Sequence, residues 1–135
     1  MTVEKTREMT LAGQDDVVLA RQAVRTAAVE IGLNLIDQTK IVTAASELAR
    51  NTVVYGGGGL ARIEILRRDG KAGVRLTFED RGPGIADIAV AMKDGYTSGG
   101  GLGLGLGGAK RLSDEFQIES RAGEGTKIAI TKWKG

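Results

Sequence analysis

The alternation of apolar and polar residues along the chain predicts two amphipathic helices before most of the strands. In two segments apolar side chains recur three and four positions apart, which is the spacing of one helix face. The first helix is predicted from a cap at Asp15 or Asp16 to about Ile31, and the second over residues 38–55 with Asp37 as its cap. The predicted buried positions are Val17, Ala20, Val24, Ala27, Ala28 and Ile31, then Ile41, Ala44 or Ala45, Leu48 and Thr52.

A two-residue period predicts the strands. They cover residues 3–11, which suit an edge strand, and residues 61–68, 73–79, 116–120 and 126–133. Asp69-Gly70 is a turn pair that predicts a hairpin between the second and third strands. Helices are also expected at 86–93 and 104–113. Helices that precede and interrupt antiparallel strand pairs indicate an α+β fold, with one sheet and helices on one of its faces.

Composition narrows the classes of function. The chain has 135 residues without an internal repeat or composition break, so one domain over residues 1–135 is expected. Its 19 basic and 17 acidic residues give a net charge of +2, which offers no case for a nucleic-acid or membrane surface. Cysteine and histidine are absent, which excludes disulfides, histidine metal ligands and a histidine general base. The polar N-terminus and the lack of a membrane-length apolar run predict a cytoplasmic protein.

Residues 98–112 are rich in glycine, with Leu102, Leu104 and Leu106 between the glycines. Glycine-rich sequence is usually a flexible linker. A solvated linker has no use for leucines, however, and the segment runs directly into a predicted helix. A glycine loop before a helix N-terminus exposes unpaired N–H groups beside the positive end of the helix dipole, which favours phosphate binding.

Glu47 and Asn51 lie four residues apart on the second predicted helix and therefore share a face. The simplest interpretation is a solvated polar face. The functional alternative is a pocket in which the asparagine oxygen holds a hard cation such as Mg²⁺ and the carboxylate accepts a proton.

Two further positions combine turn chemistry with possible ligand chemistry. Asp80 ends an apolar strand and begins Asp-Arg-Gly-Pro-Gly-Ile, a turn sequence. An aspartate there can also accept a hydrogen bond from an exocyclic amine, while Gly82 and Gly84 let the backbone approach a flat base. Thr126 follows Gly-Glu-Gly at the last strand, where a tight hairpin is the simplest interpretation.

In this order, Glu-x-x-x-Asn on a helix, Asp-x-Gly-x-Gly after a strand, a glycine loop before a helix and Gly-x-Gly-Thr at a last strand resemble the GHKL superfamily of ATP-binding proteins. The resemblance covers about residues 40–130 and implies the Bergerat fold, a two-layer sandwich with a mixed, largely antiparallel sheet. Residues 43–58 are similar to the RsbT group of stressosome switch kinases, relatives of the sporulation anti-sigma kinases.

The resemblance implies a role for each matching residue. Glu47 would be the general base for the substrate hydroxyl, and Asn51 would be both an ATP contact and the Mg²⁺ ligand. Asp80 would bind the adenine amino group. The remaining ATP contacts implied are Gly82 and Gly84 under the base, Gly101, Gly103 and Gly105 around the phosphates, Thr126 near adenine, and Lys110 and Arg50 beside the phosphates.

The implied function is a serine/threonine-protein kinase that uses Mg²⁺ and ATP. Its substrate would be a STAS-domain antagonist or scaffold protein in bacterial partner switching. Once released, it would activate a PP2C-type phosphatase, and a homodimer is left open. One alternative is a non-catalytic, nucleotide-gated anti-sigma factor or scaffold-binding module, against which the presence of Glu47 argues. A second is an ATPase whose hydrolysis drives domain closure.

Overall fold

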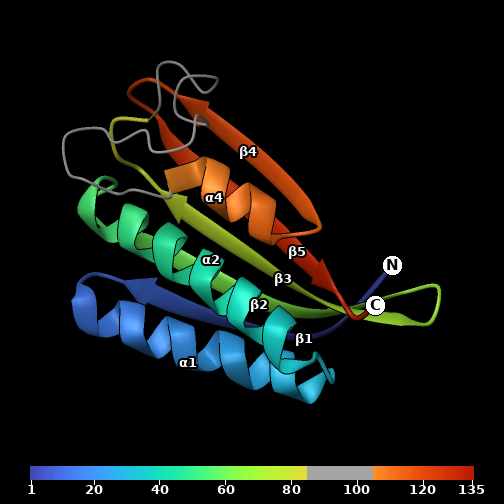
Figure 1. The fold of residues 1–135 in the computed structure, drawn as a ribbon. Coiled ribbons are helices and arrows are strands. Elements are labelled where there is room, and N and C mark those ends of the chain that lie inside the picture. The colour runs from blue at the N-terminus through green and yellow to red at the C-terminus, as the bar shows by residue number, and fades with distance from the viewer. Residues whose placement is uncertain (85–104) are drawn as a thin grey trace.

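The computed structural model describes residues 1–84 and 105–135. They form two layers, a five-stranded sheet and helices that cover one of its faces (Figure 1). The strands are β1 (Thr2–Leu11), β2 (Gly59–Arg68), β3 (Lys71–Asp80), β4 (Glu115–Arg121) and β5 (Gly125–Trp133), and the helices are α1 (Gln14–Glu30), α2 (Leu35–Val54) and α4 (Gly105–Leu112). The α+β prediction is confirmed. The strand order is β1-β2-β3-β5-β4, and all described strand pairs are antiparallel, where a mixed, largely antiparallel sheet was expected.

The hairpin between β2 and β3 is closed by the predicted turn. Asp69 has φ of 52° and Gly70 has φ of 80°, the two positive values that a two-residue hairpin turn with the twist of its strands requires. This turn fixes the pairing of the two strands from Arg68 opposite Lys71 to Gly59 opposite Asp80. On its other side β3 pairs with β5, which places Asp80 opposite Thr126. The register therefore brings two predicted site residues together.

The core lies between the sheet and the helices. The predicted stripe of α2 is buried, and the predicted face of α1 is buried except for half-exposed Ile31 at its C-terminal cap. Val74, Leu76 and Phe78 of β3 face the same core, as expected. Thr52 is buried at 3% exposure, and its hydroxyl donates to the Leu48 carbonyl at 2.9 Å, so it costs little there. Within the described residues no helix is long and apolar enough to cross a membrane.

The second helix begins earlier than predicted. Its first residue is Leu35, and the cap is Asn34, whose side-chain oxygen accepts the Asp37 backbone N–H at 2.8 Å. Asp37 is instead the third residue of the helix, where its charge lies beside the positive end of the helix dipole. Both residue types cap helices well, so the sequence did not discriminate between them.

The first helix is capped differently from the prediction as well. Gly13 occupies the cap position, and Asp16 lies three residues inside the first turn. The Asp16 carboxylate accepts the N–H groups of Ala12 at 2.8 Å and Gly13 at 3.2 Å, as the second half of a capping box does. The expected helix at residues 86–93 and the expected start of the last helix at residue 104 lie outside the described residues.

Replacing Asn34 with alanine is expected to lower the free energy of unfolding by about 1 kcal/mol, because the Asp37 N–H loses its acceptor. Urea denaturation measures the change, and Asn34→Ser is the matched control, since serine also caps helices. A Ser variant as destabilised as the Ala variant would contradict the capping role.

Candidate functional site

The predicted site residues that the structure describes belong to elements that meet at one end of the two layers. The C-terminal half of α2, the end of β3 and the beginnings of β5 and α4 meet there (Figure 1). Helix α4 packs against α2, and β3 is paired with β5. Residues that are far apart in the chain are thus brought to one end of the fold, some on a face of α2 and others at the ends of strands.

Glu47 and Asn51 lie one helical turn apart on α2, and both are half-buried. Glu47 Oε2 and Asn51 Oδ1 are shielded from solvent, and in the described part of the chain they are the two buried side-chain polar atoms without a hydrogen-bond partner. Leaving such an atom unsatisfied costs about 1–3 kcal/mol. Because these oxygens are buried, a solvated polar face does not describe them, and a ligand that binds both would account for their arrangement.

A hard cation fits the Asn51 end of this pair. The neutral amide oxygen of asparagine is an accepted ligand for Mg²⁺, which prefers oxygen and usually takes only one or two protein ligands. Within residues 1–84 and 105–135 no group of three or more aspartate or glutamate side chains is placed to hold a metal alone. Asn51 Oδ1 would therefore hold a Mg²⁺ ion as a single protein ligand and not as part of a described acidic cluster.

Asp80 forms the turn that its sequence predicts and keeps one oxygen available. Its Oδ1 accepts the Gly82 N–H at 2.9 Å, a hydrogen bond two residues along the chain that is typical of aspartate in turns. Oδ2 accepts no hydrogen bond from the described residues. The turn interpretation of Asp80 is therefore confirmed, and the contact with a ligand N–H group stays a prediction for Oδ2.

Thr126 lies opposite Asp80 and is paired with a residue that the sequence reasoning missed. Ser120 of β4 lies opposite Thr126, and the two hydroxyl oxygens are 2.8 Å apart. The Ser120 hydroxyl also lies 3.1 Å from the Gly125 carbonyl, to which it donates. The tight hairpin expected before Thr126 is present, with the Glu124 N–H donating to the Arg121 carbonyl at 2.9 Å. The pairing register of β4 and β5 is the signal that places Ser120 beside Thr126, and the sequence alone does not give that register.

Glycines at this end allow backbones to approach closely. A Cβ on Gly82 would lie 2.7 Å from Gly56 Cα, and a Cβ on Gly84 would overlap the Arg121 carbonyl oxygen. Gly84 also has φ of 74°, which side chains rarely adopt. The Gly123 N–H donates to the Pro83 carbonyl at 2.7 Å, so the turn after β3 and the turn before β5 support each other.

Of the predicted phosphate loop, the structure describes its end. Gly105 is buried and begins α4, whereas Gly101 and Gly103 lie outside the described residues. The N–H groups of the first turn of α4 have no partner within the helix, an arrangement suited to an anion. Helix α4 begins at the same end of the fold as the C-terminal half of α2 (Figure 1). Lys110 and Arg50 are exposed side chains on α4 and α2, and neither forms an ion pair with a described residue.

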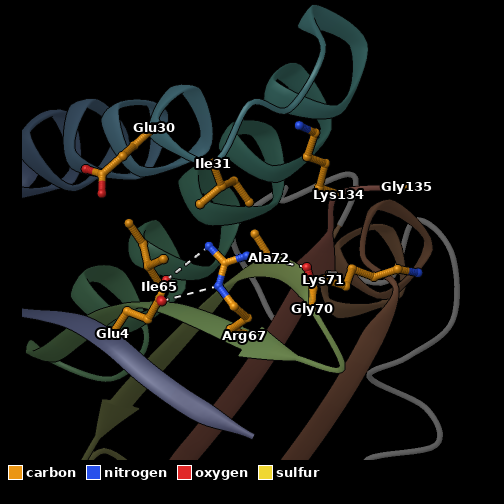
Figure 2. A pocket seen from close by; sticks show the side chains of 10 residues that line it. All are labelled: Glu4, Glu30, Ile31, Ile65, Arg67, Gly70, Lys71, Ala72, Lys134 and Gly135. Carbon is orange, nitrogen blue, oxygen red and sulfur yellow. Dashed lines mark hydrogen bonds and ion pairs between the residues drawn. The ribbon is translucent and has the colours of Figure 1, made fainter.

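A cavity of about 480 Å³ lies at the other end of the sheet, beside the β2–β3 turn. Figure 2 shows Arg67 there, pointing at Glu4 and at the Gly70 carbonyl, to which it donates hydrogen bonds of 3.2–3.4 Å. Its neighbour Glu30 forms an ion pair with Lys5 at 2.7 Å. These charges are compensated within the chain, and none of the predicted site residues lines this cavity.

Comparison of the chain with known proteins identifies a family and close relatives. Residues 36–134 match the family described as histidine kinase-, DNA gyrase B-, and HSP90-like ATPase. The chain is 52% identical over 118 residues to the serine/threonine-protein kinase RsbT of Bacillus subtilis (strain 168), with 87% of this chain and 89% of that protein covered. It is 30% identical over 141 residues to the anti-sigma F factor of Clostridium novyi (strain NT), with 98% and 96% covered.

A solved structure of a related protein has a similar fold. The RsbU and RsbW domains of a Mycobacterium tuberculosis protein superpose with a TM-score of 0.65 at 27% identity, over 95% of this chain and 32% of that one. The family match extends over most of the chain, and the similarity to the Bacillus kinase covers nearly the whole of both proteins. The chain therefore belongs to the histidine kinase-, DNA gyrase B- and HSP90-like ATPases, and within them to the ATP-dependent serine/threonine-protein kinases of the RsbT type.

Proposed function

We propose that residues 1–135 act as one kinase domain that transfers the γ-phosphoryl group of ATP to a serine or threonine of a STAS-domain antagonist or scaffold protein. The setting would be bacterial partner switching in the cytoplasm, within a stressosome pathway. The observation that carries this proposal is a pair of buried oxygens, Glu47 Oε2 and Asn51 Oδ1, for which residues 1–84 and 105–135 supply no hydrogen-bond partner. They belong to the end of the fold where β3 ends and β5 and α4 begin. The similarity to a serine/threonine-protein kinase and to an anti-sigma factor supports it.

In the proposed reaction Glu47 is the general base. Its carboxylate takes the proton of the substrate hydroxyl as that oxygen bonds to the γ-phosphorus. The bond between the γ-phosphorus and the bridging oxygen breaks at the same time, and ADP leaves with the electron pair. A positioned base contributes typically 10²–10⁴-fold to such a step. Positioning and charge neutralisation supply most of the remainder in phosphoryl transfer.

Asn51 would hold Mg²⁺ through Oδ1, and the ion would neutralise charge on the phosphate oxygens when bound. Donors from the chain would supply the other phosphate contacts: the N–H groups at the start of α4, beginning with Gly105, and the side chains of Lys110 and Arg50. Gly101 and Gly103, which precede α4, would contribute further N–H groups from the chain.

The adenine base would bind between the end of β3 and the beginning of β5. Asp80 Oδ2 would accept a hydrogen bond from the exocyclic amino group. Thr126, whose hydroxyl is hydrogen-bonded to Ser120 and which lies opposite Asp80, would contact the edge of the base. Gly82 and Gly84 would lie under the base, in a turn whose close packing against Gly56 and Arg121 leaves no room for side chains at these two positions.

Asp80→Asn is expected to weaken ATP binding by about 1.5–3 kcal/mol, because one charge-assisted hydrogen bond is lost. Purine riboside triphosphate, which lacks the amino group, should lose much less. Titration calorimetry with both nucleotides measures the difference. An equal loss for the two would contradict the contact between Asp80 and the amino group.

We also propose that phosphorylation releases the kinase, which then activates a PP2C-type phosphatase. A protein that carries RsbU and RsbW domains in one chain gives structural support for such a pairing. To test the switch, the chain is mixed with its STAS-domain partner and either ADP or Mg²⁺-ATP, then separated by size-exclusion chromatography. We expect a complex with ADP and free kinase with ATP.

The similarity to anti-sigma F factor supports one alternative function, a binding module whose partner binding is controlled by nucleotide without phosphoryl transfer. In the same experiment such a module would release its partner with a non-hydrolysable ATP analogue as well as with ATP. The kinase releases its partner only with ATP, and only as phosphate appears on the partner.

A further inference from the structure

The loop that follows α2 packs against the end of β3, and a glycine makes this contact possible. Gly56 is the second residue after α2. A Cβ at Gly56 would lie 2.5 Å from Asp80 Cβ and 2.6 Å from Asp80 Oδ2, and the Asp80 carboxyl carbon would be closer still. Real Cβ atoms do not approach heavy atoms this closely, so a side chain at position 56 and the present position of the Asp80 carboxylate exclude each other.

The backbone of Asp80 is confined, so the strain would fall on its carboxylate and on the loop after α2. Residue 80 is paired on one side with Gly59 and on the other with Thr126. A Cβ on Gly125 would already overlap the Asp80 carbonyl oxygen, which shows how closely β5 approaches. Rotation of the Asp80 side chain would move the carboxyl carbon and Oδ2 away from residue 56, but it leaves Asp80 Cβ in place. Relief of all three contacts therefore needs a shift of the loop after α2 together with rotation of the carboxylate, which breaks its 2.9 Å hydrogen bond from the Gly82 N–H.

Gly56 is also linked to the other half of the site. Its N–H donates to the Asn51 carbonyl at 3.0 Å, and the Tyr55 N–H donates to the same oxygen at 2.9 Å. Gly56 is not among the glycines with positive φ, so its backbone conformation is open to any residue. The requirement for glycine at this position is therefore steric and comes from Asp80.

We infer that Gly56 is a positioning residue for nucleotide recognition: its lack of a side chain places the Asp80 carboxylate toward the amino group of the base, at a distance from Asn51 that the helix end fixes. The inference rests on the proposed function, in which Asp80 reads the base and Asn51 binds near the phosphates. Gly56 itself would contact neither the base nor the phosphates and would act through Asp80.

The test compares Gly56→Ala with Gly57→Asn, a control in the same loop. Gly57 has φ of 74°, which asparagine tolerates, and open space around its Cβ position. We expect Gly56→Ala to weaken ATP binding about ten- to a hundredfold. It should weaken purine riboside triphosphate much less, while Gly57→Asn resembles the wild type with both. Equal weakening of both nucleotides by Gly56→Ala would overturn the inference.

A second readout needs no nucleotide. The Gly82 amide donates to Asp80 Oδ1, so its NMR resonance should move in Gly56→Ala and stay in Gly57→Asn. An unmoved Gly82 resonance would overturn the inference whatever the affinities are. If that resonance moves and wild-type protein binds both nucleotides equally, the base-reading role of Asp80 fails, while the placement of its carboxylate by Gly56 stands.

A stability cycle covers the case in which Gly56→Ala folds poorly. Asp80→Gly removes the three side-chain atoms that a Cβ at position 56 would meet. The loss of unfolding midpoint caused by Gly56→Ala should then be much smaller in the Asp80→Gly background than in the wild type. An equal loss in both backgrounds would show that residue 56 acts on other neighbours and would overturn the inference.

Discussion

Glu47→Gln is expected to lower the rate of phosphoryl transfer by about 10²–10⁴-fold and to leave ATP affinity within a few-fold of the wild type. Glutamine keeps the size of the side chain and an oxygen but cannot take the substrate proton. The Glu47 Oε2 atom has no partner in the described residues, so its replacement breaks no hydrogen bond within that part of the chain. Single-turnover transfer at saturating ATP separates the chemical step from binding.

Glu119→Gln is a suitable control because Glu119 is an exposed glutamate of β4 outside the proposed site. It should transfer phosphate at the wild-type rate. A Glu47→Gln variant that also does so would show that Glu47 is not the base.

Asn51→Ala is expected to abolish most of the Mg²⁺-dependent ATP affinity, with a loss of at least about 10- to 100-fold. Replacing residues that only hydrogen-bond to a metal's ligands typically lowers metal affinity about 10- to 100-fold, so the loss of a ligand itself should lower it at least as much. Its effect on stability should be the opposite of a core substitution. The buried Asn51 Oδ1 atom has no hydrogen-bond partner among the described residues, so its removal takes away an unsatisfied group and should not lower the free energy of unfolding.

Calorimetry with Mg²⁺ and ATP measures the affinity, and urea denaturation measures the stability. Asn34→Ala supplies the reverse pattern, since it should lose stability and keep nucleotide affinity. A fully active but destabilised Asn51→Ala protein would make Asn51 a structural residue and would contradict the metal role.

Periodicity predicted much of this fold because local rules govern it. The Leu48 and Thr52 stripe of α2 is buried as its spacing indicates, and Asp69-Gly70 forms the expected hairpin turn. The beginnings of the helices were wrong by a few residues. Asn34 competes with Asp37 for the same capping role, and the choice depends on how the chain enters the helix.

The candidate site was predicted as a set of residues, while its contacts depend on tertiary structure. Asp80 could be chosen from its turn sequence, but its contact with Gly56 arises because the end of α2 packs against the end of β3. Ser120 was missed because its pairing with Thr126 depends on the register between β4 and β5. The burial of Glu47 Oε2 and Asn51 Oδ1 likewise depends on the packing around α2, which their four-residue spacing does not reveal.

The most direct measurement of the proposed kinase activity is transfer of labelled γ-phosphate from Mg²⁺-ATP to a STAS-domain partner. Wild-type protein and Glu47→Gln are compared at equal, saturating nucleotide, and mass spectrometry locates the phosphate. We expect near-stoichiometric phosphoserine or phosphothreonine with the wild type, and transfer slowed by about 10²–10⁴-fold with the variant. A wild-type protein that binds ATP and its partner together yet places no phosphate on the partner would contradict the kinase mechanism.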